Sequence, residues 1–120
     1  MKYGALLALL LSIPALASAQ NKVDTRAPRL NNRQEILRER DALARRLLAP
    51  GDSVVVRVFA LIDEKGQPRD VDTKDEYEER VREAAVGLVR KMRFTPAQLG
   101  GKPKTVLLTI PVKLVRPREK

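Results

Sequence analysis

The sequence predicts an α+β domain in which a three-stranded antiparallel sheet carries two helices on one face. Two segments show the apolar spacing of amphipathic helices, and two others alternate in the way that strands do. A turn signature after the first long strand favours a hairpin with a short polar return strand. The expected order of elements is therefore α-β-β-α-β.

The first helix is expected over residues 33–48. Asn32 followed by Glu35 resembles a capping box, in which the two side chains satisfy backbone N–H groups at the start of a helix. Apolar residues then recur at helical spacing, and they are Ile36, Leu37, Leu43, Ala44, Leu47 and Leu48. Pro50 and Gly51 predict the end of the helix.

Residues 53–62 change to a period of two and are apolar on both faces, which is typical of a central strand. Residues 63–66 read as a hairpin turn, with Gly66 at the position that needs a positive φ. The return strand, residues 67–72, is short and polar and carries Pro68. These features favour an edge of the sheet.

The second helix is expected to begin at a second capping box, formed by Thr73 and Glu76. One apolar stripe follows, made of Tyr77, Val81, Ala84, Ala85, Leu88, Val89 and Met92. Acidic residues gather near its start and basic residues near its end, the order that the helix dipole favours. Pro96 predicts the end of this segment.

The last strand is expected over residues 105–115, after a turn at Gly100 and Gly101. Its apolar side chains face one way, whereas Thr109, Pro111 and Lys113 face the other. Because Pro111 cannot donate a backbone hydrogen bond, this strand should lie at an edge. It should pair with the free side of residues 53–62 and leave its own outer edge open.

The N-terminus has the features of a cleaved secretory signal over residues 1–19. Lys2 precedes an apolar run over residues 5–16, and Ala17 and Ala19 form a small-residue cleavage pattern. An uncleaved membrane anchor would need about 20 apolar residues, and Pro14 interrupts the shorter run here. Cleavage would leave 101 of the 120 residues and reduce the net charge from +9 to +8, because Lys2 is the only charged residue removed.

The mature chain is expected to have a flexible leader over residues 20–30, a domain over residues 31–116 and a basic tail over residues 117–120. We expect no integral membrane segment after signal cleavage. Export also makes nucleic acid an unsuitable partner, although 24 Lys and Arg outnumber 15 Asp and Glu.

Composition argues against an enzyme. The chain contains no His and no Cys, so it cannot form a serine or cysteine triad, a Cys/His zinc site or a disulfide. Residues 70–76 place oxygen ligands at alternate positions, but Lys74 and Asp75 stand where a calcium loop needs a third ligand and a glycine. A strand end and a helix cap explain this segment better. We therefore expect no cofactor and no metal.

A corner motif in the last third carries the most specific signal, and it consists of Arg93, Phe94, Pro96, Ala97, Gly101 and Pro103. With the basic helix end before it and the alternating strand after it, this motif resembles the C-terminal domain of the TonB family. The resemblance covers about residues 28–115. Members that transmit proton-motive force have an uncleaved anchor and a long Pro-rich span, whereas this chain has a cleavable signal and a short leader.

The resemblance implies a periplasmic protein-binding module whose last strand pairs with an extended partner segment. The residues expected at this edge are Thr105, Leu107, Thr109, Pro111, Lys113 and Val115. The implied partner is an outer-membrane receptor or another envelope transport component, and edge pairing between two copies would give a homodimer.

An alternative function is that of a cationic structural protein that holds anionic cell-envelope polymers. The residues that would do so are Arg38, Arg45, Arg46, Lys102, Lys104, Arg116, Arg118 and Lys120. Salt distinguishes the two functions, because ionic strength screens exposed charges while edge pairing partly survives it.

Overall fold

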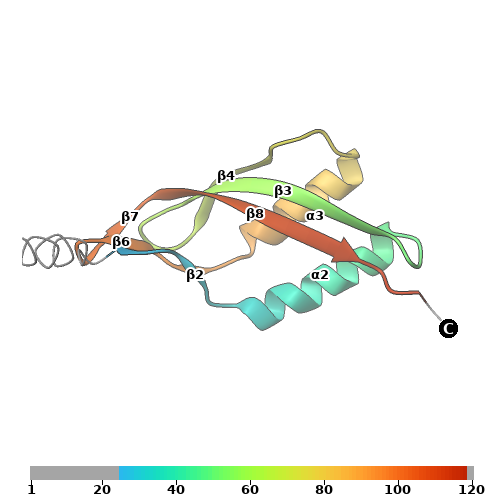
Figure 1. Cartoon of the computed structure of the whole chain (residues 1–120), viewed down its shortest axis with the longest axis horizontal. Coiled ribbons are helices and arrows are strands. Elements are labelled where there is room, and N and C mark those ends of the chain that lie inside the picture. Colours follow the sequence, from blue (N-terminus) through green and yellow to red (C-terminus); the bar gives the residue numbers. More distant parts are fainter. Residues whose placement is uncertain (1–24, 119–120) are drawn as a thin grey trace, which may run out of the picture.

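The structure is a computed structural model that describes residues 25–118, and Figure 1 shows its elements. The main elements are helices α2 (Arg33–Leu47) and α3 (Glu79–Arg90) and strands β3 (Ser53–Ile62), β4 (Pro68–Thr73) and β8 (Val106–Val115). Five short strands accompany them: β1 (Thr25–Arg26), β2 (Arg29–Leu30), β5 (Phe94–Thr95), β6 (Ala97–Leu99) and β7 (Lys102–Lys104). The predicted signal, residues 20–24 of the leader and the last two residues of the tail lie outside the described residues.

The predicted α+β fold class is confirmed. Strands β4, β3 and β8 form an antiparallel sheet in that order, so β3 is central as predicted. Val58 of β3 lies opposite Thr73 of β4 and Ile110 of β8. Neither helix within residues 25–118 is long and apolar enough to cross a membrane.

One face of the sheet carries both helices. From Val56 onward, every second residue of β3 is fully buried there, namely Val56, Val58, Ala60 and Ile62. Ile36 and Ala44 of α2 and Ala85 and Val89 of α3 belong to the same buried cluster. Each Val or Ile buried in this way stabilises the fold by about 1.5–3 kcal/mol. The opposite face is open, and Val55 is 48% exposed on it.

The short strands correct the expected leader. Residues 25–30 are not a free segment, because Thr25 pairs with Leu99 and Leu30 pairs with Phe94. Strands β1, β6 and β7 form a second small sheet, and β2 and β5 form a separate pair. Pairing over two or three residues uses backbone groups and leaves no apolar period in the sequence, so the pattern could not reveal it.

The predicted start of the second helix is wrong. Strand β4 runs through Thr73, and α3 begins only at Glu79, with no side-chain hydrogen bond at its N-cap. In the loop between them, Asp75 pairs with Arg57, and the Tyr77 hydroxyl accepts a hydrogen bond from the Arg57 backbone N–H (3.0 Å). These contacts with β3 compete with the local capping box that the sequence suggests.

Helix α2 begins at Arg33 as predicted and ends one residue earlier than predicted. The predicted capping box does not form, because Asn32 makes no capping bond to the helix backbone. Its side chain instead contacts Glu35 (3.3 Å) and bonds to the chain after α3. Gly66 takes a φ of 81° in the hairpin, as predicted.

Candidate partner-binding site

The outer edge of β8 is open among the residues that the structure describes. The Lys74 N–H donates to the Arg57 carbonyl (3.0 Å), so the backbone groups of Arg57 point toward the β4 side. Because these directions alternate along a strand, the even-numbered residues of β3 bond to β8. Their partners in the register are the even-numbered residues of β8, so the odd-numbered residues direct their backbone groups away from β3.

These odd-numbered residues are the predicted edge residues within β8: Leu107, Thr109, Pro111, Lys113 and Val115. Thr105 precedes the strand. No other strand among residues 25–118 pairs with this side of β8. Pro111 fits this direction, because its nitrogen has no hydrogen to donate and faces away from the β3 ladder.

The side chains of the edge residues lie on the open face of the sheet. All are exposed, and the exposed fractions are 65% for Leu107 and 42% for Val115. The intervening residues face the helices, and Val112 and Leu114 are buried. The alternation predicted for this strand is therefore confirmed.

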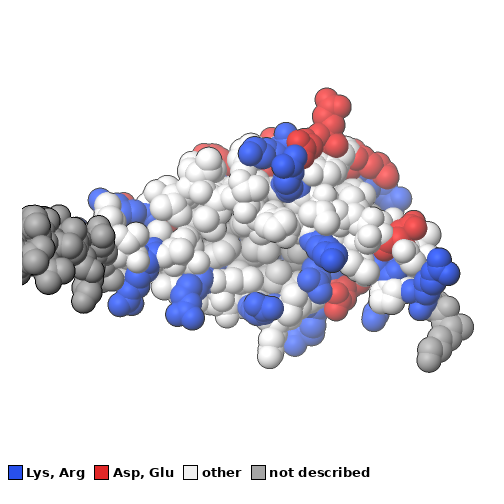
Figure 2. Space-filling view, in the orientation of Figure 1, with Lys and Arg blue, Asp and Glu red and all other residues white. Residues whose placement is uncertain are grey.

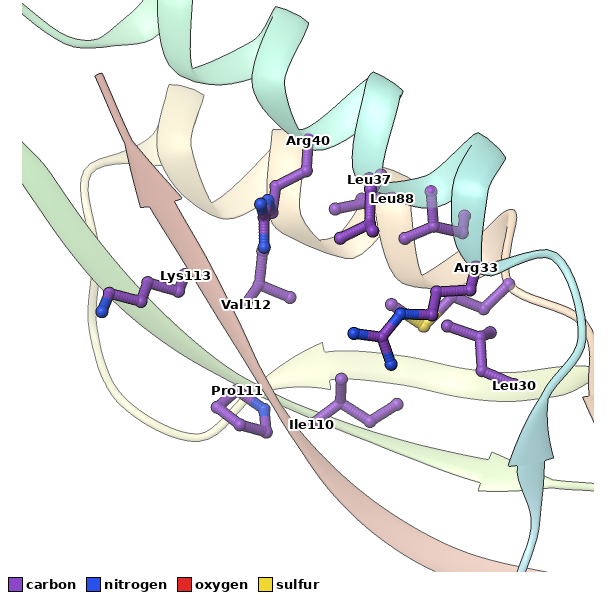
Figure 3. A pocket seen from close by; sticks show the side chains of 11 residues that line it. Leu30, Arg33, Leu37, Arg40, Leu88, Ile110, Pro111, Val112 and Lys113 are labelled. Carbon is purple, nitrogen blue, oxygen red and sulfur yellow. The ribbon is translucent and has the colours of Figure 1, made fainter. Parts of the chain in front are cut away.

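A groove of about 240 Å³ runs between α2 and β8. Leu37 from α2, Leu88 from α3 and Ile110 from β8 contribute to its apolar lining. Figure 3 shows Arg33 and Arg40 reaching from α2 across the mouth of the groove toward β8. A strand added to β8 would place alternate side chains over this groove.

The charge at the groove is basic. Arg33 has no ion-pair partner among residues 25–118, and Arg40 makes a loose contact with its neighbour Asp41 (3.4 Å). No acidic residue of the described range 25–118 lines the groove. Lys113 points to the other side of the strand (Figure 3). The groove therefore favours a partner segment with apolar and acidic side chains.

Hydrogen bonds fix the N-terminal end of α2. The Asn32 side chain donates to the Lys91 carbonyl (2.8 Å) and accepts from the Arg93 N–H (2.9 Å). The Lys91 ammonium lies 3.1 Å from Glu39. The start of α2 is thus attached to the chain that follows α3.

Arg116 fixes the other end of α2 to the end of β8. Its guanidinium donates to the carbonyls of Arg45 (3.0 Å) and Leu48 (2.9 Å), which lie near the C-terminus of the helix. The Arg116 carbonyl accepts from the Gly51 N–H (2.8 Å). A helix held at both ends gives the groove a defined width without a bound partner.

The corner motif lies away from the open edge of β8. Phe94 is buried and its N–H donates to the Gly66 carbonyl (2.9 Å), while Arg93 bonds to Asn32. Ala97 is buried at the start of β6, after half-buried Pro96. The remaining members are Gly101, at the β6–β7 turn with a φ of 79°, and Pro103, in β7 opposite Gln98. The motif holds the N-terminal strands, the hairpin and the chain after α3 together.

Two carboxylates of residues 70–76, those of Asp72 and Asp75, have basic partners. The backbone N–H of Thr73 and the Arg82 guanidinium (2.7 Å) both bond to Asp72 and lower its pKa. The hydrogen bond from Arg57 lowers the pKa of Asp75. Among residues 25–118, no three acidic residues gather in a way that could hold a metal ion.

Sequence reasoning missed the helical side of the groove. Arg33, Leu37 and Arg40 were not predicted as site residues, although their spacing places them on one face of α2. That spacing was the available signal. Its meaning depended on knowing that this face lies beside the open edge of β8.

Comparisons of the chain with protein-family models, with curated proteins and with solved structures found no match. Similarity to the TonB C-terminal domain family stays a prediction that rests on the corner motif and the order of elements.

Proposed function

We propose that this chain is a periplasmic protein-binding module, similar to the TonB C-terminal domain, that binds an extended segment of a partner protein at the edge of β8. The observation that carries the proposal is the row of outward-directed backbone groups on β8 beside a preformed apolar groove. An added strand satisfies such groups through backbone hydrogen bonds. The module performs no chemistry of its own.

Backbone pairing supplies affinity in small steps. Leu107, Thr109, Lys113 and Val115 each offer an N–H and a carbonyl, whereas Pro111 offers only a carbonyl. Each bond contributes about 0.5–1.5 kcal/mol net. Because Pro111 lacks a donor in the middle of the row, an antiparallel partner keeps the other bonds of the row but has one carbonyl, opposite Pro111, that receives no backbone hydrogen bond.

Side chains supply specificity. In a strand paired with β8, every second side chain faces α2, where apolar residues contact Leu37 and Ile110. Acidic side chains of the partner that face α2 at the margin of the groove lie within reach of Arg33 and Arg40. In the segment that fits, the side chains that face α2 are apolar over the groove and acidic beside Arg33 and Arg40, and no proline stands where the backbone must donate.

The proposed partner is an outer-membrane receptor or another envelope transport component. A second copy of the chain could use the same edge, and a homodimer of this kind would compete with the partner. Sedimentation at increasing protein concentration distinguishes a homodimer from a monomer. Cross-linking in the periplasm, followed by identification of the attached protein, names the partner.

The test is an NMR titration of the labelled chain with synthetic peptides whose every second residue, on the face toward α2, is apolar or Glu, and with N-terminal peptides of outer-membrane receptors. We expect the amides of β8 and the start of α2 to shift. The variant Arg33→Glu/Arg40→Glu should weaken binding of the acidic peptides, whereas the control Arg38→Glu/Arg45→Glu changes net charge equally and should not. No shift of β8 amides at millimolar peptide would contradict the proposal.

A second function, the holding of anionic envelope polymers, is supported by exposed basic residues that lie apart from the groove. Arg38 and Arg45 are exposed on α2, and Lys102 and Lys104 are exposed on β7. Retention on polymer-coated beads should disappear as ionic strength rises. Retention by an acidic peptide should fall only in part, because backbone bonds persist.

A further inference from the structure

The far end of the molecule contains a second hollow, which does not belong to the groove beside α2. It has a volume of about 580 Å³ and lies where β1, β6 and β7 meet the start of β8. Its lining is largely apolar and includes Ala27, Pro28, Ala97, Leu99, Val106 and Leu108. Leu99 is 52% exposed although it is large and apolar.

The described residues around this hollow are basic. Among residues 25–118, no acidic residue lines it, and Arg26 and Lys104 do. Lys102 is on the same short strand as Lys104, and both are exposed without an ion-pair partner among residues 25–118. Residues 93–118 contain no Asp or Glu at all. In Figure 2, basic side chains lie at the left end, where Figure 1 places β6 and β7, whereas the largest acidic patch lies at the upper right.

The strands at this end are poor templates for a peptide. β1 has two residues, and β7 has three, of which Pro103 cannot donate a hydrogen bond. A peptide placed in the largely apolar hollow would bury more backbone groups than the few polar side chains of the lining can satisfy. A hydrocarbon chain has no such groups, and the lysines at the margin suit phosphate.

We propose that this end of the molecule docks on the surface of an anionic phospholipid bilayer. Leu99 and the hollow contact acyl chains near the headgroup boundary, and Lys102 and Lys104 contact lipid phosphates. The proposal is independent of partner binding at β8. The hollow uses Val106 and Leu108, whereas the groove begins at Ile110, so the docked module keeps free the part of the open edge that lies beside the groove.

The test is co-flotation of the exported full chain with vesicles, after mass spectrometry has established its N-terminus. Vesicles of phosphatidylethanolamine with phosphatidylglycerol are compared with vesicles of zwitterionic phosphatidylcholine alone. A Lys near an anionic surface contributes about fivefold to binding. Lys102→Glu/Lys104→Glu should therefore weaken binding to anionic vesicles by at least about 25-fold.

Matched variants separate this end from general cationic attraction. Arg38→Glu/Arg45→Glu changes the net charge equally on α2 and should retain most of the binding. Leu99→Ser should weaken binding about tenfold through lost apolar contact, whereas Val55→Ser on the open face of the sheet should not. An NMR spectrum that is unchanged away from the substituted residues shows that each variant is folded.

Three results would overturn the proposal. They are an absence of binding to anionic vesicles, equal losses for the β7 and α2 charge variants, and displacement of the vesicles from the hollow by a soluble acidic peptide. The last result would assign the hollow to a protein. Because the β7 variants leave the groove intact, their peptide titration should match that of the unmodified chain, so failure here is distinct from failure of the β8 proposal.

Discussion

β4 forms one edge of the main sheet and β8 forms the other, and the two edges are built differently. β4 is six residues long, begins at Pro68 and has an irregular register with β3, with Asp70 at a φ of 51°. β8 is ten residues long, and its pairing with β3 is continuous from Val106 to Val115.

The β4 side is also closed beyond the strand itself. After Thr73, Lys74 and Tyr77 satisfy the carbonyl and the N–H of Arg57, which β4 no longer reaches. Short strands, irregular register and proline prevent unwanted pairing at sheet edges. β8 has only a proline, Pro111, and a charged residue, Lys113, which also disfavours pairing at an edge. The chain therefore protects one edge and leaves the other available, beside the groove.

The largest expected effect tests the two sides of β8. Leu114→Ala removes a fully buried side chain and should lower the free energy of unfolding by about 2–5 kcal/mol. Leu107→Ala removes an exposed one and should change it by less than about 0.5 kcal/mol. Urea unfolding measures both. Equal losses would mean that the assigned alternation of β8, and hence the direction of its backbone groups, is wrong.

The next effect concerns the hairpin that joins β3 to the protected edge. A Cβ at Gly66 would lie 1.8 Å from the Phe94 carbonyl oxygen, and the φ of 81° already disfavours other residues. Gly66→Ala should cost at least about 2 kcal/mol. The matched control is Gly87→Ala in α3, where a Cβ meets nothing within 4 Å. This substitution should raise the free energy of unfolding by about 0.4–1 kcal/mol. Thermal unfolding that ranked the two variants in the opposite order would contradict this hairpin geometry.

A smaller effect tests the closure of the protected edge. Tyr77→Phe removes the hydroxyl that accepts from the Arg57 N–H and should cost about 0.5–1.5 kcal/mol. Hydrogen exchange at the Arg57 amide should become faster, while that at Val58 should stay slow because Val58 bonds within the sheet. Unchanged exchange at Arg57 would show that the tyrosine does not close this edge.

The smallest effect is the pH dependence of stability. The pKa of Asp63 is lowered by the backbone N–H of Gln67 and by Arg69 (2.7 Å), and the pKa values of Asp72 and Asp75 are lowered as well. Carboxylates whose pKa is lowered in the folded state stabilise the fold at pH values above their ordinary pKa of about 4. This stabilisation is lost as the pH falls through the lowered pKa of the folded state.

The chain has no His, so we expect the midpoint of urea unfolding to stay nearly constant between about pH 5 and 8. Below about pH 4 it should fall. Asp63→Asn should make this acid-side fall shallower, with Glu64→Gln in the same turn as the control. A steep change near neutral pH would contradict this assignment of the titrating groups.

The main elements were predictable because their side chains carry the signal. The bounds of β3 agree with the predicted residues 53–62, since a strand buried on one face and half-buried on the other shows a strong period of two. The start of α3 was not predictable. Thr73 and Glu76 suggest a local cap, but Asp75 and Tyr77 find partners on β3 that only the folded chain brings near.

The candidate site was also predictable only in part. The alternation of residues 105–115 and Pro111 predicted the open edge. The groove was not predictable, because it depends on the distance between α2 and β8. Asn32 and Arg116 set this distance by bonding to segments about 60 to 70 residues away. Asn32 looked like a helix cap in the sequence, and its actual partners are far along the chain.

Residue-resolved hydrogen exchange of β8, with and without a bound peptide that presents apolar and acidic side chains to α2, tests the central claim most directly. In the free monomer, we expect fast exchange at Leu107, Thr109 and Lys113 and slow exchange at Leu108 and Val112. The peptide should slow the odd-numbered amides and leave the even-numbered ones unchanged. Odd-numbered amides that are already protected in the free monomer, or that stay unprotected when the peptide is bound, would contradict an open edge that binds partners.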